Sequence, residues 1–110
     1  MKPVAWMGDS RKRIQEFSPT ARHLAGHELM RVQSGREPTD WKPMPSVGVG
    51  AKEIRVREAS GAWRVIYVAK FEEAVYVLHA FQKKTQRTAK QDIDLAAERY
   101  RALAKQRKEK

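Results

Sequence analysis

Residues 47–82 constrain the fold more than any other part of the chain, because they read as three strands joined by two short turns. The segments "VGVGAKEIRVRE", "AWRVIYVAKF" and "AVYVLHAFQ" are rich in β-branched and aromatic residues, as strands are. "ASG" and Glu72-Glu73 supply the turns. We therefore predict an antiparallel meander, and the nearly continuous apolarity of its third strand predicts a central position covered on both faces.

The residues before the meander predict a short strand and two helices. "PVAWM" reads as the strand, and "RKRIQEF" as a helix that Asp9 or Ser10 can cap. Ser18-Pro19 starts the second helix, because proline lacks the N–H that would be unsatisfied there, and Gly35 is placed to end it. Three prolines argue against regular structure in the loop at residues 35–46.

The residues after the meander predict one more helix. Thr88 and Gln91 fit a capping box, and the apolar residues that follow recur at helical spacing. The predicted order is β-α-α-β-β-β-α, an α+β domain in which a mainly antiparallel, twisted sheet has its helices packed on one face. We assign the domain to residues 1–104 and treat residues 105–110 as a basic C-terminal tail.

Composition limits the classes of function. A chain of 110 residues suffices for one domain with its own core. It has no cysteine, no apolar run as long as a membrane span and no signal peptide, so we expect a cytoplasmic protein. It has neither a glycine-rich phosphate loop nor a cysteine metal site, and "HLAGHE" lacks a third zinc ligand. We therefore expect no metal and no cofactor.

The basic residues point to a polyanionic partner, because 23 Lys and Arg against 13 Asp and Glu give a net charge of +10. The tail carries part of this surplus, but Arg55 and Arg57 lie within a predicted strand. Alternation places both on the face away from Ile54 and Val56, and hairpin pairing brings Arg64 beside them. The alternative is that these arginines form a solvated sheet face.

The segment "LHAFQKKTQ" adds further polar groups at the end of the third strand. Alternation puts His79 and Phe81 on one face, and Lys83 and Lys84 follow at the sheet edge. Phe81 alone is more typical of a core, and His79 alone of a satisfied buried histidine. Their occurrence together with the arginines favours a functional site.

The hairpin "EIRVREASGAWRVIYV", followed by "VYVLHAFQKKTQRTAKQDIDLA", resembles toxins of the RelE/ParE superfamily, in particular the HigB-like branch of phage-derived host-growth inhibitors. The resemblance is strong over residues 47–98 and extends to residues 1–46 through the order of elements. It implies a small cytoplasmic toxin that is encoded beside an antitoxin. Many members are ribosome-dependent endoribonucleases that cut mRNA, whereas others poison DNA gyrase.

The resemblance also implies site residues. Two basic residues on the strand before the hairpin turn correspond to Arg55 and Arg57, and an arginine that follows an aromatic residue on the next strand corresponds to Arg64. The basic residue after the last strand corresponds to Lys84, or to its neighbour Lys83. These residues form the expected catalytic set.

The general base does not follow from the resemblance, because the tyrosine that some members use has no counterpart before Tyr100. We take His79 as the candidate, since imidazole ordinarily titrates near neutrality. The remaining cations of this region are expected to hold RNA: Lys52, Lys83, Arg87 and Lys90.

These residue types imply a metal-free cleavage in which the RNA 2′-OH attacks the adjacent phosphate while arginines bind its oxygens. We expect mRNA, the ribosome and a helix-turn-helix antitoxin as partners, with operator DNA reached only through the antitoxin, and no membrane. The alternatives are a toxin of the same fold that inhibits gyrase and a non-toxic RNA- or DNA-binding module. Arg64 is expected at the surface, where its removal would change the free energy of unfolding by only about 0.5 kcal/mol.

Overall fold

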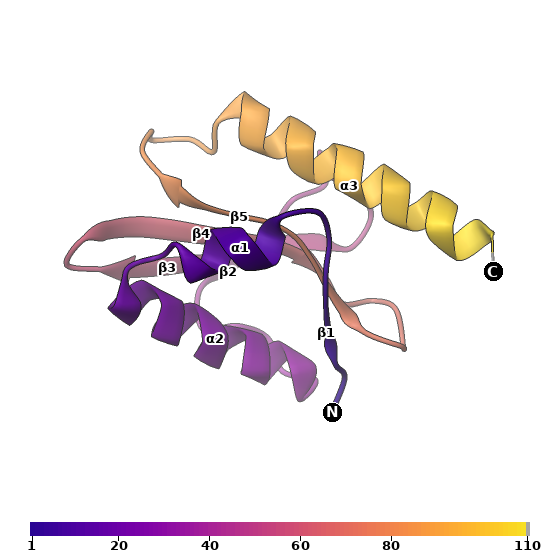
Figure 1. Ribbon diagram of the computed structural model, residues 1–110, viewed down its shortest axis with the longest axis horizontal. Coiled ribbons are helices and arrows are strands. Elements are labelled where there is room, and N and C mark those ends of the chain that lie inside the picture. The colour runs from indigo at the N-terminus through magenta and orange to yellow at the C-terminus, as the bar shows by residue number, and fades with distance from the viewer. Residues whose placement is uncertain (110) are drawn as a thin grey trace.

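The computed structural model describes residues 1–109 and folds them into a five-stranded sheet with three helices (Figure 1). The architecture is α+β, as the sequence predicts. The strands are β1 (Val4–Trp6), β2 (Trp41–Pro43), β3 (Ala51–Glu58), β4 (Gly61–Val68) and β5 (Val75–Lys83). The helices are α1 (Ser10–Gln15), α2 (Pro19–Gln33) and α3 (Lys90–Lys108).

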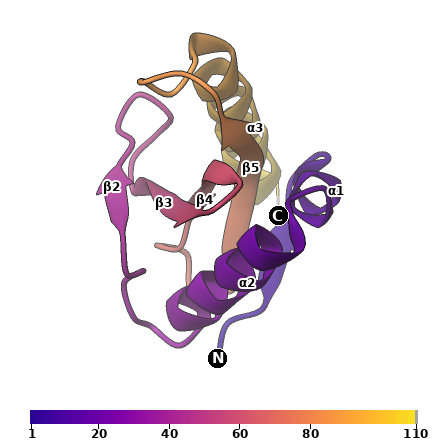
Figure 2. The same cartoon turned by 90° about the vertical axis from the view of Figure 1, so that its left-hand side faces the viewer.

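The strands lie in the order β1-β5-β4-β3-β2. The predicted antiparallel meander is confirmed as β3, β4 and β5, and β5 is an inner strand, as its apolarity predicts. The short β1 runs parallel to β5, so that Val4 lies beside Val75. Figure 2 looks nearly along the strands and places β2 at the sheet edge away from α1.

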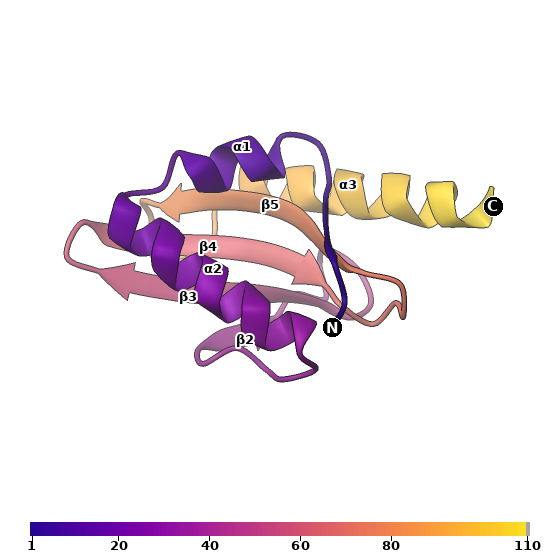
Figure 3. The same ribbon diagram turned by 60° about the horizontal axis from the view of Figure 1, so that its bottom comes forward.

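The helices cover both faces of the sheet, so the prediction that they pack on one face is wrong. Figures 1 and 3 show α1 and α2 together on one side, here called the α2 face, and α3 alone on the other, the α3 face. The physical reason is that β4 and β5 are apolar on both faces, and each apolar face of a sheet must be covered.

Each face has its own buried core. On the α2 face, Ala25 and Leu29 of α2 pack with Ile54, Val65 and other strand residues. The core of the α3 face is made by Ile66, Val68, Leu78, Phe81, Ala96 and Leu103, among others. The odd residues of β3 and the even residues of β4 around the hairpin therefore face α3. Arg55, Arg57 and Arg64 consequently lie on the α3 face.

The loop at residues 35–46 contains a strand that the sequence analysis did not predict. β2 pairs with β3 alone, with Trp41 opposite Ile54 and Pro43 opposite Lys52. Because β2 is an edge strand, Pro43 can occupy a position that an inner strand would not tolerate. The three prolines therefore shorten the strand without preventing it.

The three predicted helix starts have different outcomes. Asp9 is the N-cap residue of α1, but its side chain makes no capping hydrogen bond. The start of α2 is confirmed, because Ser18 Oγ accepts a hydrogen bond from the N–H of Ala21 at 3.1 Å and Pro19 follows it. The capping box at Thr88 is wrong, since α3 starts after Ala89 without a side-chain cap. Thr88 Oγ1 instead donates to the carboxylate of Glu53 at 2.7 Å.

Arg99 ties α3 to the start of α1 around the sheet. Its guanidinium donates to Asp9 at 2.6 Å and to the carbonyl oxygen of Leu78 at 2.9 Å. The hydrogen bond from Arg99 lowers the pKa of Asp9 below its ordinary value. Gly8 makes room for this contact, because a Cβ there would lie 2.5 Å from Arg99 Nε.

The C-terminal helix is longer than predicted. Residues 105–108, which the sequence analysis treats as part of a basic tail, belong to α3, and residue 110 lies outside the described residues. Within residues 1–109, none of the helices combines the length and the apolarity that crossing a membrane requires.

Candidate functional site

The candidate site lies on the α3 face at the hairpin end of the sheet. Arg55, Arg64 and Phe81 form one cross-strand row, because Arg55 pairs with Arg64 and Arg64 with Phe81. The next row toward the turn joins Arg57, Ala62 and Lys83. We call Arg55, Arg57, Arg64 and Lys83 the basic cluster. The predicted placement of the three arginines on one face is confirmed.

The members of the basic cluster differ in their access to solvent. Arg57 is exposed, and Arg55 and Lys83 are half-buried. Arg64 is only 1% exposed, so its predicted surface position is wrong. The reason is its place on the inner strand β4, between Arg55 on one side and Phe81 on the other.

Arg64 is buried together with Glu53, which is 0% exposed. Arg64 Nε lies 3.5 Å from Glu53 Oε1, and Arg64 also donates to the carbonyl oxygen of Trp63 at 3.0 Å. The other carboxylate oxygen of Glu53 accepts the hydrogen bond from Thr88, and Lys42 Nζ lies 3.9 Å from Oε1. A buried guanidinium thus has one buried carboxylate as its counter-ion.

Like charges in the basic cluster oppose one another. Burial lowers the pKa of Arg64; Glu53 counteracts this effect, and the charges of Arg55 and Arg57 add to it. Burial likewise lowers the pKa of Lys83, and the charge of Arg64 contributes to the same effect. Asp40 Oδ1 lies 4.0 Å from Arg55 Nη1, and the Asp40 side chain is half exposed. The cluster therefore holds more positive charge than its nearby carboxylates balance, which favours an anionic ligand.

His79 lies on the same face as the arginines, one cross-strand row farther from the hairpin turn than Arg55 and Arg64. It is 2% exposed, stacks on Phe81 with ring centroids 5.0 Å apart, and places Nε2 2.8 Å from Asp92 Oδ1. Burial lowers its pKa, while the hydrogen bond and charge of Asp92 act in the opposite direction. Nδ1 is buried without a hydrogen-bond partner among the described residues.

Lys84 does not join the basic cluster. It is exposed and lines a hollow of about 390 Å³ together with Arg13 of α1 and Trp63 of β4. It also shares a smaller hollow of about 150 Å³ with Lys83, but it is not in a cross-strand row with the arginines. Its neighbour Lys83 occupies the row beside Arg57. Of the two lysines that the resemblance left open, Lys83 is the one placed with the arginines.

The other predicted RNA-binding residues are scattered. Lys52 pairs with Glu37 at 2.9 Å and lines a hollow with Tyr67, a core residue of the α2 face. Arg87 is exposed in the segment before α3, and Lys90 is exposed and pairs with Asp94 at 2.9 Å. These three residues are not brought together with the arginines by any described contact.

The acidic and neutral partners of the site are not among the residues predicted from the sequence. Glu53 alternates with Arg55 and Arg57, so the spacing that places the arginines on one face also places Glu53 there. Thr88 and Asp92 carried no such signal, because only the fold brings the start of α3 over the sheet. Within residues 1–109, no group of three or more His, Cys, Asp or Glu side chains is arranged to hold a metal ion.

A family model of phage-derived Gp49-like proteins (DUF891) matches residues 12–101. The matched range contains the whole basic cluster, Glu53 and His79. No curated protein matches the chain. This family is of the RelE/HigB-like toxin type, which agrees with the predicted superfamily, and the match does not distinguish the branch within it. Since the match spans most of the 110 residues, the chain belongs to the phage-derived Gp49-like family.

Proposed function

We propose that this protein is the toxin of a type II toxin–antitoxin pair and cleaves mRNA on the ribosome at the basic cluster. The observation that carries the proposal is the convergence of Arg55, Arg57, Arg64 and Lys83 from three adjacent strands onto one face. Guanidinium groups bind phosphate oxygens in a bidentate manner, and a surplus of positive charge stabilises the charge that develops during phosphodiester cleavage. The HigB-like resemblance supports the same reading.

In the proposed reaction, the ribose 2′-oxygen attacks the adjacent phosphorus, the bond to the 5′-oxygen breaks, and a 2′,3′-cyclic phosphate forms. The leaving 5′-oxygen takes up a proton from water and departs as a hydroxyl group. Arg55 and Arg57 are accessible enough to meet the phosphate first. His79 is the candidate acceptor of the 2′ proton. If Nε2–H donates to Asp92, Nδ1 is left as the accepting atom. Because His79 is buried, the groups that cover it must move when RNA binds.

The proposal includes an antitoxin that keeps the protein silent in the cell. The HigB-like resemblance suggests a helix-turn-helix protein that also represses its own operon, so that operator DNA is reached only through the antitoxin. Co-expression of the protein encoded by the adjacent reading frame is expected to restore growth. Growth arrest that persists under co-expression would remove that protein as the antitoxin.

The test is to map mRNA ends after induction of the wild type, Arg57→Ala and Arg101→Ala. Arg57 and Arg101 are both exposed arginines, so both variants lose one charge and neither should change the fold. We expect discrete cuts at ribosome-occupied codons for the wild type and Arg101→Ala, and a loss of about 10²–10³ in cleavage rate for Arg57→Ala. Growth arrest with intact mRNA and broken DNA would replace this proposal by gyrase inhibition.

A second candidate function is RNA binding without cleavage. The observation that favours it is the burial of Arg64 and His79, which removes two of the five predicted catalytic groups from the surface. Under this alternative the wild type binds RNA in a salt-sensitive manner, but mRNA ends are unchanged after induction. The end-mapping experiment therefore separates the two candidates.

A further inference from the structure

The outer face of α2 carries features that neither the fold nor the basic cluster uses. The helix buries Ala21, Ala25, Leu29 and Val32 against the sheet. On its outer side lie His23, Gly26, His27, Met30 and Ser34, which we call the α2 ridge. Met30 is 54% exposed and Leu24, beside the ridge, is 37% exposed; both are large apolar side chains left to solvent.

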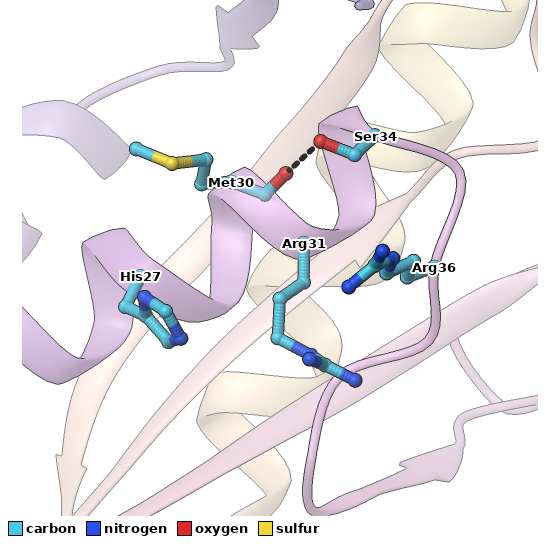
Figure 4. Close-up of a pocket in the computed structure, with 5 residues that line it drawn as sticks. All are labelled: His27, Met30, Arg31, Ser34 and Arg36. Atoms are coloured by element: carbon cyan, nitrogen blue, oxygen red, sulfur yellow. Dashed lines mark hydrogen bonds between the residues drawn. The ribbon is translucent and has the colours of Figure 1, made fainter.

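A hollow of about 360 Å³ adjoins the C-terminal end of the α2 ridge. Its lining residues within the described chain are His27, Met30, Arg31, Ser34 and Arg36 (Figure 4). Figure 4 shows Arg36 reaching back from the following loop toward Arg31. The lining thus combines an apolar side chain with two guanidinium groups and includes no carboxylate from residues 1–109.

The nearest carboxylate on the helix is already engaged. Glu28 accepts hydrogen bonds from the backbone N–H and the hydroxyl of Thr39, at 2.7 and 2.8 Å, and lies 3.9 Å from Arg31. The charge around the α2 ridge is therefore positive, with Arg22, Arg31 and Arg36 beside the two histidines. A partner that suits this surface is acidic and also presents apolar side chains to Met30 and Leu24.

Gly26 is the feature that points to a helix as the partner. Glycine in the middle of a helix weakens it, yet Gly26 has no positive φ, and apart from its chain neighbours and the nearby backbone of its own helix, no described atom lies within 4 Å of where a Cβ would be. Neither the backbone nor the packing of this chain requires glycine there. A missing side chain on an exposed ridge allows the backbone of a second helix to approach closely.

We propose that the α2 ridge is the docking surface for an acidic amphipathic helix of a protein partner, which lays its apolar face over Met30 and Leu24 and its carboxylates against Arg31 and Arg36. The proposal rests on the proposed toxin function, because such a toxin requires a protein that silences it. The α2 ridge lies on the opposite side of the sheet from the basic cluster, so the partner and RNA would meet different surfaces.

The experiment uses the protein encoded by the adjacent reading frame as the probe and measures its affinity for the purified full chain by calorimetry. Met30→Asp is expected to weaken binding about 30-fold or more, because it places a carboxylate in the apolar contact. Gly26→Ala is expected to weaken binding while raising the melting temperature by about 4 °C, since alanine favours the free helix. No merely structural role of Gly26 predicts opposite changes in these two measurements.

Arg57→Ala is the matched control, because it removes a charge from the basic cluster and leaves the α2 ridge intact. Binding that survives Met30→Asp and Gly26→Ala would overturn the proposal. If binding then fails with Arg57→Ala, the partner covers the basic cluster instead. A failure of the wild type to bind the probe would also overturn it, whereas the proposed cleavage of mRNA would stand. Self-association that Met30→Asp abolishes would assign the ridge to a second copy of this chain and overturn the proposal.

Discussion

Arg64 and Glu53 depend on each other, because each is the counter-ion of a group that is buried away from water. Removing one partner of a buried pair leaves the other charge uncompensated, which costs about 3–5 kcal/mol. We therefore expect Arg64→Ala to lose a large share of the free energy of unfolding. Loss of activity in that variant would say nothing about catalysis.

The double variant Arg64→Met with Glu53→Gln separates stability from activity. It removes both charges, retains an acceptor for Thr88, and is expected to recover most of the stability in urea unfolding. A folded double variant that no longer cuts mRNA shows that the Arg64–Glu53 pair takes part in the reaction. If the double variant is as unstable as Arg64→Ala, the two side chains do not act as a pair.

His79 makes stability depend on pH. Burial lowers its pKa, so the folded protein takes up a proton less readily than the unfolded chain, whose imidazole titrates near about 6.5. The stability linked to this group is fully present above about pH 6.5 and is lost as the pH falls through the lower pKa of the folded state. The difference in unfolding free energy between wild type and His79→Gln should therefore be constant above neutrality and shift against the wild type in acid.

Asp92→Asn provides the second arm of this measurement. The carboxylate of Asp92 opposes the lowering of the His79 pKa, so its removal should deepen the loss of stability in acid. The readout is the midpoint of urea unfolding between pH 8 and pH 5. Wild type and His79→Gln curves that stay parallel throughout this range would contradict the linkage.

At the scale of elements, Gly8 makes room for the hydrogen bond that links Arg99 of α3 to Asp9 at the start of α1. Its φ is +55°, and a Cβ would approach the guanidinium of Arg99 to 2.5 Å. Alanine in the left-handed region costs about 1–2 kcal/mol by itself. We expect Gly8→Ala to destabilise the protein by more than that, because Arg99 must also leave its position between Asp9 and Leu78.

Gly35→Ala is the matched control for Gly8→Ala. Gly35 has a φ of +84° but no atom within 4 Å of a Cβ, so only the backbone strain applies. Thermal unfolding measures the stability that each variant loses. The amount by which the loss for Gly8→Ala exceeds that for Gly35→Ala is the contribution of the contact with Arg99. Equal losses at the two positions would mean that the α1–α3 tie contributes nothing.

The elements themselves were largely predictable because their signals are local. Ser18-Pro19 starts α2 by its own hydrogen bonding, and the alternation in β3 sorts Ile54 from Arg55 without help from distant residues. Local sequence signals do not show which face of the sheet each helix covers. The apolar run of β5 requires cover on both faces, but nothing in it states which helix provides each cover.

The candidate site likewise has features that short-range sequence rules predict and features that they do not. Arg55, Arg57 and Arg64 could be placed together from strand spacing and hairpin pairing, since both are short-range rules. The burial of Arg64 could not be predicted, because it depends on residues that arrive from far along the chain. Thr88 illustrates this: its sequence context is typical of a helix cap, yet its hydroxyl donates to Glu53, which lies 35 positions earlier.

At the scale of the whole molecule, the net charge of +10 predicts binding to RNA that weakens steeply with salt. For single-stranded RNA, the logarithm of the binding constant falls with the logarithm of salt concentration by about 0.7 for each phosphate contact. Arg57→Ala should lower this slope by about 0.7 if Arg57 holds a phosphate. Arg101→Ala, which carries the same loss of charge, should leave the slope unchanged.

Fluorescence anisotropy with a labelled single strand at several salt concentrations measures this slope. A flat response between low and moderate salt would contradict electrostatic binding altogether. Equal changes for Arg57→Ala and Arg101→Ala would show that overall charge attracts RNA and that the basic cluster holds no particular phosphate.

The parallel pairing of β1 with β5 sets the order of events while the protein is being made. The pairing of Val4 with Val75 cannot form until Val75 has been synthesised, about 4–14 s later at synthesis rates of about 5–20 residues per second. The arginine-bearing hairpin likewise waits for Lys83 and then for Thr88. During that interval the nascent chain has no finished site. A protein proposed to attack translation would thus acquire its active form only after the residues up to Thr88 have been synthesised.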